Sequence, residues 1–298
     1  MRGMSKRQAK KIGILTIALL IGLSACSTYG QPVSIPTLIP RTSTPQPTCT
    51  PSPPTETSTP TPLTCLTQPG RVESGALNVT KPPQKYFIYL PPCYDEKTDV
   101  RYPVLYLLHG QTYTDDQWIR LGAVDALDNL ILSGEAMPFI IVFPDDRYWN
   151  LPPGTGFGER LVDVIIPYID SNYRTLPDRN HRAIGGMSRG AGWAFELGFS
   201  RWDLFSVIGL HSLAVFQKDG SKLGNWVSEI PADSLPSVFM DIGSNDQELA
   251  GAISIEEQFN DIGLPHEWHR YQGAHTEEYW SAHVNEYIQW YAEQWNNP

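Results

Sequence analysis

Eight short segments of this chain of 298 residues have a strand-like pattern of apolar and polar positions, and longer mixed segments separate most of them. Several of the eight are almost continuously apolar, which is typical of parallel strands covered on both faces. We therefore predict eight β-strands. They cover residues 71–79, 85–90, 104–109, 139–143, 183–186, 206–210, 238–242 and 266–271.

Helical spacing of apolar residues occurs between these strands. Residues 124–133 and 249–262 show it, and each segment precedes a glycine, Gly134 or Gly263, suited to a left-handed C-terminal cap. The apolar stripe of a last helix consists of Val284, Tyr287, Ile288, Tyr291 and Trp295. Strands alternating with helices predict an α/β fold, with a mostly parallel, doubly wound sheet, helices on both faces and an antiparallel hairpin of the first two strands at its edge.

The first 25 residues carry five basic and no acidic residues, with an apolar run over 12–23, which predicts an export signal. The run is shorter than the roughly 20 residues that span a bilayer. It ends in Leu23-Ser24-Ala25-Cys26, which resembles the lipobox of bacterial lipoproteins. The resemblance implies that Cys26 is lipidated and becomes the mature N-terminus. A free cysteine after ordinary cleavage and an uncleaved anchor are the alternatives.

Residues 26–68 cannot build a hydrophobic core. Between residues 27 and 68 there are 10 prolines and 12 threonines, and only Arg41 and Glu56 are charged. This composition predicts an extended linker, with a reach on the order of 100 Å at about 3 Å per residue. The remaining residues, 69–298, are enough for one α/β domain.

Charge and cysteine usage narrow the possible partners. Without the signal the chain keeps 17 basic and 32 acidic residues, a formal charge of −15, which argues against nucleic acid as a partner.

Export favours oxidised cysteines, so we predict a disulfide between Cys65 and Cys93, with two unpaired thiols as the alternative. No cysteine or histidine spacing matches a metal site, and no cofactor is predicted.

Residues 186–190 read Gly-Met-Ser-Arg-Gly, a G-x-S-x-G sequence between a predicted strand and a stretch rich in small and apolar residues, 191–197. That context predicts a nucleophile elbow, a tight strand-to-helix turn that presents the Ser188 hydroxyl to a base and to backbone N–H donors. An ordinary glycine-rich turn is the alternative, since the chain contains 24 glycines.

A nucleophilic serine needs a base and a carboxylate that orients the base. The seventh predicted strand leads into Asp246, the candidate acid, while Asp241 inside that strand is its rival. The last predicted strand leads through a glycine turn into His275, the candidate base. The alternative bases are His266, His269 and His283.

The third predicted strand ends in His109-Gly110-Gln111. In hydrolases of this kind the loop after such a strand supplies one backbone N–H for the oxyanion, and the residue after the nucleophile supplies the other. Gln111 and Arg189 are therefore the candidate donors. His109 is expected to support the loop through hydrogen bonds.

The order serine, aspartate, histidine along the chain is that of α/β hydrolases, and residues 69–298 resemble their “putative esterase”, or esterase D-like, branch. That branch includes feruloyl esterases, S-formylglutathione hydrolase, siderophore esterases and the antigen 85 mycolyltransferases. The matching segments, besides the elbow, are YLPP at 89–92, RYPVLYLLHG at 101–110, IPYID at 166–170, YRT at 173–175, DLF at 203–205, and GAH at 273–275 followed by Trp280. The resemblance implies Ser188 as nucleophile, Asp246 as acid and His275 as base. Arg189 departs from the family pattern, in which smaller apolar residues are frequent, and would bind an acidic substrate group or pair with a nearby carboxylate.

Four side chains near the predicted mouth of the site are candidate substrate contacts. They are Trp118, Trp149, His211 and Trp280. Aromatic faces stack on sugar or phenolic rings. Packing of loop against sheet is the alternative for each tryptophan, and support of a neighbouring side chain is the alternative for His211.

Together these features predict a lipid-anchored, extracytoplasmic serine esterase that hydrolyses carboxylic esters through an acyl-serine intermediate. Its position outside the membrane suggests feruloyl or acetyl esters of polysaccharides, a step that rests on family analogy. Two alternatives are an acyltransferase acting on a cell-surface sugar, as the mycolyltransferases do, and a catalytically silent surface-binding module.

Overall fold

The computed structural model describes residues 64–78, 81, 83–146 and 156–296. The predicted signal (1–25), the lipidation site Cys26, the linker up to residue 63 and Trp149 lie outside the described residues. Within the part that is described, no helix combines the length and the apolar character that crossing a bilayer requires.

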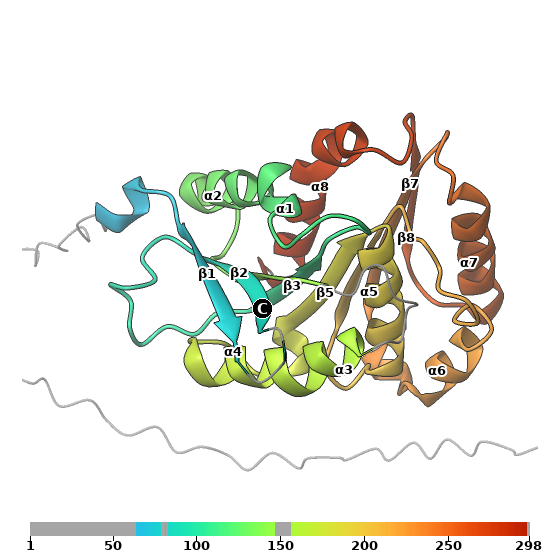
Figure 1. Cartoon of the computed structure of the whole chain (residues 1–298), viewed down its shortest axis with the longest axis horizontal. Coiled ribbons are helices and arrows are strands. Elements are labelled where there is room, and N and C mark those ends of the chain that lie inside the picture. Colours follow the sequence, from blue (N-terminus) through green and yellow to red (C-terminus); the bar gives the residue numbers. More distant parts are fainter. Residues whose placement is uncertain (1–63, 79–80, 82, 147–155, 297–298) are drawn as a thin grey trace, which may run out of the picture. The chain divides into compact units, whose positions relative to one another are not determined.

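An eight-stranded sheet runs through the centre of the described domain (Figure 1). Its strands are β1 (Arg71–Leu77), β2 (Gln84–Leu90), β3 (Val104–Leu108), β4 (Ile140–Pro144), β5 (Arg182–Met187), β6 (Val207–His211), β7 (Ser237–Gly243) and β8 (Glu267–Tyr271), in the spatial order β1-β2-β4-β3-β5-β6-β7-β8. β1 and β2 form an antiparallel hairpin at one edge, β2 pairs antiparallel with β4, and the pairs from β4 to β8 are parallel. The eight predicted strands and the edge hairpin are confirmed.

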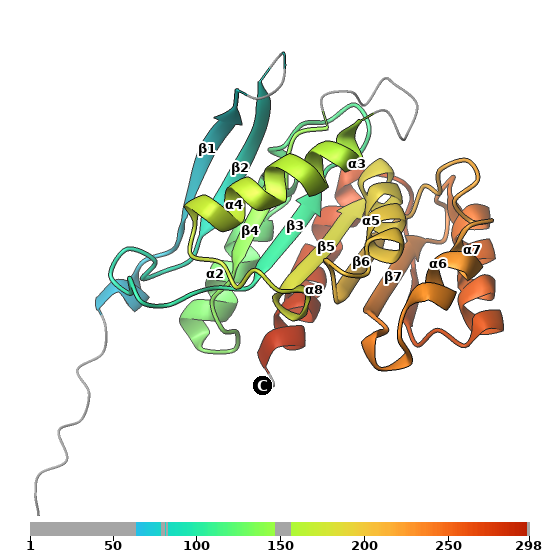
Figure 2. The ribbon, with the colours of Figure 1, turned by 90° about the horizontal axis from the view of Figure 1, so that it is seen from below.

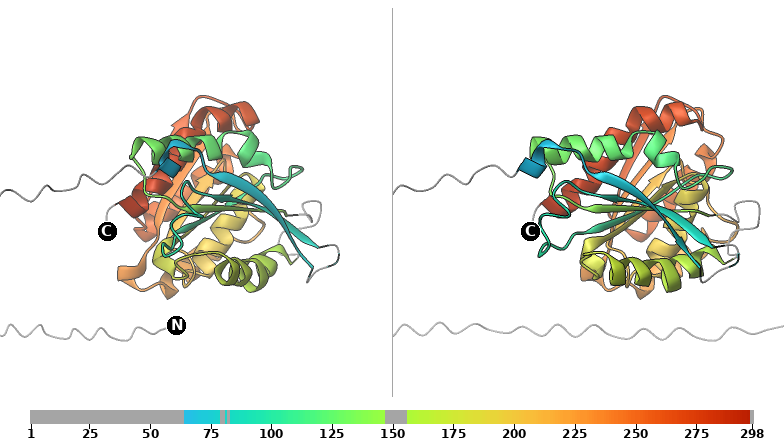
Figure 3. Two further views of the ribbon diagram at one scale, coloured as in Figure 1. Left: turned by 90° about the vertical axis from the view of Figure 1, so that its left-hand side faces the viewer. Right: turned by 60° about the vertical axis from the view of Figure 1, so that its left-hand side comes forward.

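Helices cover both faces of the sheet (Figures 2 and 3). They are α1 (Gln117–Arg120), α2 (Ala123–Ser133), α3 (Phe157–Arg160), α4 (Ile166–Asn172), α5 (Arg189–Ser200), α6 (Leu223–Glu229), α7 (Leu249–Ile262) and α8 (Glu277–Asn296). One hydrophobic cluster joins the sheet to α3–α7 and contains Phe195 and Phe259. A second cluster joins the opposite face to α1, α2 and α8 and contains Leu127 and Tyr287. The predicted doubly wound α/β architecture is confirmed.

Two helices end where their glycines predict. Gly134 after α2 has φ 79° and Gly263 after α7 has φ 70°, and both donate their N–H groups back to carbonyls of the last helical turn. Both predicted caps are confirmed.

The helical stretch between β4 and β5 was not among the predicted helices. It joins α3, a π-helical turn (Leu161–Ile165) and α4. A π-turn adds a residue to the turn and shifts the apolar face, so no single 3.6-residue period runs through the stretch. Pro167 lies in the first turn of α4, a position that tolerates proline. In the sequence alone, the same proline argues against a helix.

A disulfide joins Cys65, in a short 3₁₀-helix (Thr64–Thr67), to Cys93 in the loop after β2, with a Cα–Cα distance of 5.1 Å. The predicted pairing is present. It links the start of the described domain covalently to the end of its second strand.

Candidate active site

β5 turns into α5 at Ser188, whose φ of 55° and ψ of −119° are rare for a residue with a side chain. The Ser188 N–H donates to the His211 carbonyl at 2.9 Å and thereby holds the turn against β6. A Cβ on Gly186 would collide with the backbone of Gly190, and a Cβ on Gly190 would collide with the Leu108 carbonyl oxygen. Both outer glycines of the pentapeptide are therefore required by close backbone approach, as expected for a nucleophile elbow.

The side chains of Ser188, His275 and Asp246 form one hydrogen-bonded chain. The His275 Nε2 atom lies 2.7 Å from the Ser188 Oγ, and Nδ1 lies 2.8 and 2.9 Å from the two carboxylate oxygens of Asp246. Because an ionised carboxylate only accepts, we assign the proton to Nδ1, which leaves Nε2 free to accept the serine proton. The three residues thus meet in the order that acyl transfer by serine requires.

Two loops bring the acid and the base together at the C-terminal ends of β7 and β8. The Asn245 N–H, next to Asp246, donates to the Gly273 carbonyl at 2.8 Å, two residues before His275. A Cβ on Gly243 would lie 2.6 Å from the same carbonyl oxygen. Close packing of the two loops therefore sets the distance between carboxylate and imidazole.

The Asp246 carboxylate is buried and remains the acceptor of the pair. Burial raises the pKa of Asp246, but the hydrogen bonds from His275 and from the Glu248 N–H, together with the charge of the histidine, outweigh burial and hold that pKa below its usual value. The His275 side chain is 16% exposed, whereas that of Asp246 is fully buried. The proton acceptor for serine therefore lies at the solvent edge of an otherwise enclosed pair.

Trp280 lies behind the imidazole. Its ring meets that of His275 edge-on, with 5.0 Å between the centroids, and its Nε1 donates to the Ser212 Oγ at 3.0 Å. Trp280 is 3% exposed, so its prediction as a substrate contact is wrong. It restrains the candidate base instead, because the first turn of α8 folds it against the sheet.

The predicted substrate contacts are also wrong for Trp118 and His211. Trp118 is a buried residue of α1, and its Nε1 donates to the Leu108 carbonyl at 2.8 Å. His211 is fully buried at the end of β6 and bonds to Asp241. Both face the second hydrophobic cluster because α1 and α8 close over that side of the sheet. The fourth candidate, Trp149, lies outside the described residues.

Asp241, the rival acid, is the centre of a separate buried cluster. Its carboxylate accepts from His211 Nδ1 at 2.7 Å, from the Tyr279 hydroxyl at 2.6 Å and from the Tyr287 hydroxyl at 2.7 Å. The Nε2 atom of His211 lies 3.1 Å from the Tyr291 hydroxyl. Asp241 is thus the internal structural partner that its place inside a strand favours.

The three alternative bases contact other groups. His266 Nδ1 bonds to the Leu264 carbonyl at 2.8 Å, His269 stacks on Phe239 with 4.8 Å between centroids, and His283 stacks on Tyr271 at 4.3 Å. Among the described histidines, His275 is the one that bonds to Ser188.

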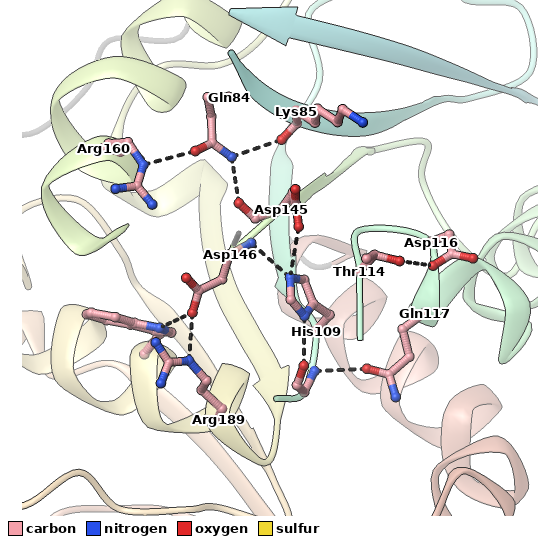
Figure 4. A network of polar contacts seen from close by, with 12 residues as sticks. Gln84, Lys85, His109, Thr114, Asp116, Gln117, Asp145, Asp146, Arg160 and Arg189 are labelled. Atoms are coloured by element: carbon pink, nitrogen blue, oxygen red, sulfur yellow. Dashed lines mark hydrogen bonds and ion pairs between the residues drawn. The ribbon is translucent and has the colours of Figure 1, made fainter. Parts of the chain in front are cut away.

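The loop after β3 carries the predicted donor Gln111, which is exposed. The Gly110 N–H donates to Gln117 Oε1 at 2.8 Å, and the Gly110 carbonyl lies 2.8 Å from His109 Nδ1 (Figure 4). His109 Nε2 accepts from the Asp146 N–H at 2.8 Å, so its proton resides on Nδ1 and is donated to Gly110. His109 supports this loop through hydrogen bonds on both ring nitrogens, as its sequence context predicts.

Arg189, the other predicted donor, opens α5, where the helix N-terminus concentrates positive partial charge. Its Nε donates to Asp146 Oδ2 at 2.7 Å between two buried side chains, and Trp193 Nε1 donates to the same oxygen at 3.0 Å (Figure 4). Of the two roles considered for this side chain, the structure shows pairing with a carboxylate.

Asp146 and Gln117 were not among the predicted site residues. Together with His109 they form a hydrogen-bonded path from the elbow to the loop after β3, which carries Gln111 and is called the oxyanion loop below. Asp146 follows the C-terminal end of a predicted strand, where polar site residues of open α/β sheets gather, and this signal could have identified it. Among the described residues there is no group of three or more histidine, cysteine, aspartate or glutamate side chains placed to hold a metal ion.

Comparison with known proteins agrees with this architecture. A family model described as “Putative esterase” matches residues 78–291. An “endo-1,4-beta-xylanase/feruloyl esterase” from Xylanibacter ruminicola is 32% identical over 146 residues, which are 45% of this chain and 20% of that protein. The chain therefore spans about a fifth of the length of this relative.

Two solved structures share the fold. A ferulic acid esterase has a TM-score of 0.67 and 27% identity and covers 76% of this chain and 100% of its own. A ferulic acid esterase from Anaeromyces mucronatus, solved in complex with ferulic acid, has a TM-score of 0.63 and 25% identity and covers 74% of this chain and 90% of its own. The chain thus has the fold of α/β-hydrolase esterases over nearly the whole described domain.

Proposed function

Because the chain belongs to the “Putative esterase” family of α/β hydrolases, we propose that it is a serine esterase that hydrolyses carboxylic esters through an acyl-Ser188 intermediate. The observation that carries this proposal is the unbroken contact from the Ser188 hydroxyl through His275 to Asp246. A silent binding module would have no need for a strained serine in contact with an oriented imidazole.

In the first half-reaction, His275 Nε2 takes the Ser188 proton while Oγ bonds to the ester carbonyl carbon. The charge that develops on the carbonyl oxygen is held by the backbone N–H groups of Gln111 and Arg189, and the Asp246 carboxylate stabilises the imidazolium. The imidazolium then gives its proton to the leaving alcohol oxygen as the carbon–oxygen bond breaks. Acylated Ser188 and free alcohol result.

In the second half-reaction, neutral His275 takes a proton from water as the water oxygen bonds to the acyl carbon. The same two N–H groups hold the second oxyanion. Proton return from His275 to Ser188 Oγ releases the carboxylic acid and restores the starting state. The path through Asp146, His109 and Gln117 keeps the two donor segments in place through both steps.

The substrates we propose are feruloyl or acetyl esters carried by polysaccharides. Similarity to a bifunctional xylanase/feruloyl esterase and to a ferulic acid esterase that binds ferulic acid supports this class. The formal charge of the exported chain, −15, suits neutral saccharides better than polyanionic ones.

Acyl-enzyme trapping tests the mechanism. The full chain in detergent is mixed with methyl ferulate or an aryl acetate, quenched in acid within the first turnovers, and digested for mass spectrometry. The peptide with Ser188 should gain the mass of the acyl group, and Ser188→Ala should gain none, whereas Ser228→Ala in α6 should behave like the wild type. Ester hydrolysis with the acyl group on another residue would contradict the proposal.

We also propose that Cys26 anchors the chain outside the cytoplasmic membrane, with residues 27–68 as a tether. The lipobox-like sequence and the Pro/Thr-rich composition support this arrangement. In bacterial cells that process lipoproteins, Cys26→Ser should move the esterase from the membrane fraction to the soluble extracytoplasmic fraction. Cys49→Ser, a matched change in the linker, should leave it in the membrane fraction. Equal fractionation of both variants would refute the anchor.

A further inference from the structure

A groove lies between the β1–β2 hairpin and the loop that follows β3. Its volume is about 380 Å³, within the range of roughly 300–1,000 Å³ that is usual for small-molecule sites. Side chains that line it are Ser74, Ala76, Lys85, Phe87 and Asp115. The acyl-transfer steps described above use none of them.

The hairpin presents one face to this groove. Ser74 pairs opposite Phe87 and Ala76 pairs opposite Lys85, so these four side chains share one face of the two strands. Phe87 is half-buried against the second hydrophobic cluster, whereas Ser74, Ala76 and Lys85 are exposed. The face therefore carries a hydroxyl, a methyl, an ammonium and one half-buried aromatic ring.

Two charged groups in the groove have no side-chain partner among the described residues. The Asp115 carboxylate accepts a hydrogen bond from its own backbone N–H, and Figure 4 shows the Lys85 ammonium directed away from the network around Asp145. Burial and then the charge of Asp145 raise the pKa of Asp115 to about 6. A half-buried carboxylate whose remaining lone pairs have no donor gains free energy when a ligand supplies a further one.

The groove borders the candidate active site. Asp115 lies on the loop that begins at Gly110, between β3 and α1. A Cβ on Gly110 would lie 3.7 Å from the Ser188 Cβ, so the same loop touches the nucleophile. A ligand bound in the groove would therefore reach the reacting ester from the side of the oxyanion loop.

We propose that this groove is a subsite for the sugar portion of a carbohydrate-linked ester. Asp115 accepts a hydrogen bond from a sugar hydroxyl, Lys85 donates one, and the ring of Phe87 packs against a sugar ring. The opposite charges of the two groups suit a neutral, hydroxyl-rich ligand rather than an ionic or apolar one. This proposal rests on the proposed esterase function, and it identifies the alcohol part of the ester substrate as a sugar.

Two esters with the same acyl group test the subsite. One is a simple methyl ester and the other is an ester of a neutral xylan-derived oligosaccharide. Asp115→Ala and Lys85→Ala should each lower the ratio of kcat/KM for the oligosaccharide ester to kcat/KM for the methyl ester by about tenfold, mainly through KM. Asp99→Ala should leave the ratio unchanged, because Asp99 is an exposed aspartate before β3, at the opposite end of the strands.

Calorimetry of the free oligosaccharide with Ser188→Ala gives a readout that does not depend on turnover. Binding that weakens about tenfold when Asp115→Ala is added supports the subsite. If the wild type hydrolyses both esters and neither variant changes the ratio, the subsite is refuted and the esterase stands. If neither ester is hydrolysed, the esterase proposal fails, and the calorimetric result alone decides whether the groove binds sugar.

Discussion

Two histidine–aspartate pairs lie on neighbouring strand ends of this sheet, and their contacts are nearly the same. In each pair Nδ1 faces a carboxylate, 2.8 Å away between His275 and Asp246 and 2.7 Å away between His211 and Asp241. In each pair Nε2 also faces a hydroxyl group, at 2.7 Å in the candidate site and at 3.1 Å in the buried cluster. By their polar contacts alone, both sites consist of a hydroxyl group, an imidazole and a carboxylate.

The difference lies in what surrounds the hydroxyl. Ser188 stands on an elbow at the end of a strand, and its histidine keeps 16% of its surface exposed. The Tyr291 hydroxyl instead fills the space over Gly185 and Gly209, where it would collide with any added Cβ, and its histidine is fully buried. The comparison teaches that a reactive triad needs room for a substrate as well as the right neighbours, whereas the same contacts in a closed core serve packing.

Removal of the two hydroxyls should give the largest contrast. Ser188→Ala should lower kcat by about 10⁶-fold without loss of stability, because the nucleophile is gone. Tyr291→Phe should keep activity within about tenfold and lower the free energy of unfolding by about 1 kcal/mol, since one hydrogen bond is lost. Ester turnover and urea unfolding measure the two effects. Loss of turnover in a stable Tyr291→Phe protein would place the buried pair in the chemistry.

Replacement of the two carboxylates should give the second-largest contrast between the two pairs. Asp246→Asn should lower kcat by about 10⁴-fold, because the amide favours the wrong tautomer of His275. Asp241→Asn should instead destabilise the fold by about 3–5 kcal/mol, since it leaves three buried donors around an uncharged group. Each variant is assayed for both turnover and unfolding. The distinction fails if Asp241→Asn lowers kcat as much as Asp246→Asn in a protein of wild-type stability.

A smaller effect concerns the pH dependence of stability. The pKa of Asp246 is lower in the folded chain than its ordinary value, so its ionised form contributes stability above about pH 4 that is lost as the pH falls through the folded-state pKa. The difference in free energy of unfolding between the wild type and Asp246→Asn should therefore shrink as the pH is lowered from about 5 to about 3. Urea titrations at several pH values measure it. A difference that grows towards acid pH would show that the carboxylate is not stabilised in the fold.

Local patterns in the sequence were sufficient for much of the molecule. Strands β3 to β6 are buried along their whole length, so each one is a mostly apolar run that needs no partner to be recognised. The pentapeptide around Ser188 is similarly local, because strand, turn and helix follow directly in the chain. Candidate acid and base were found because active residues of open α/β sheets follow strand ends.

Contacts between distant segments were beyond this kind of prediction. The pair of Arg189 with Asp146 joins residues 43 positions apart, and the burial of Trp118, Trp280 and His211 depends on helices α1 and α8 closing over the sheet. An aromatic residue near a strand end has the same sequence signature whether it lines a pocket or fills a core.

The sequence by itself determined the strands, the elbow and the order of serine, aspartate and histidine, because each depends on neighbours within a few positions of the chain. The tertiary structure alone decided that the loops bring Asp246 and His275 within hydrogen-bond distance of each other and of Ser188, and how the oxyanion loop is held. These contacts join residues that are 29 to 87 positions apart in the chain. Packing between segments so far apart leaves no local sequence pattern that would predict it.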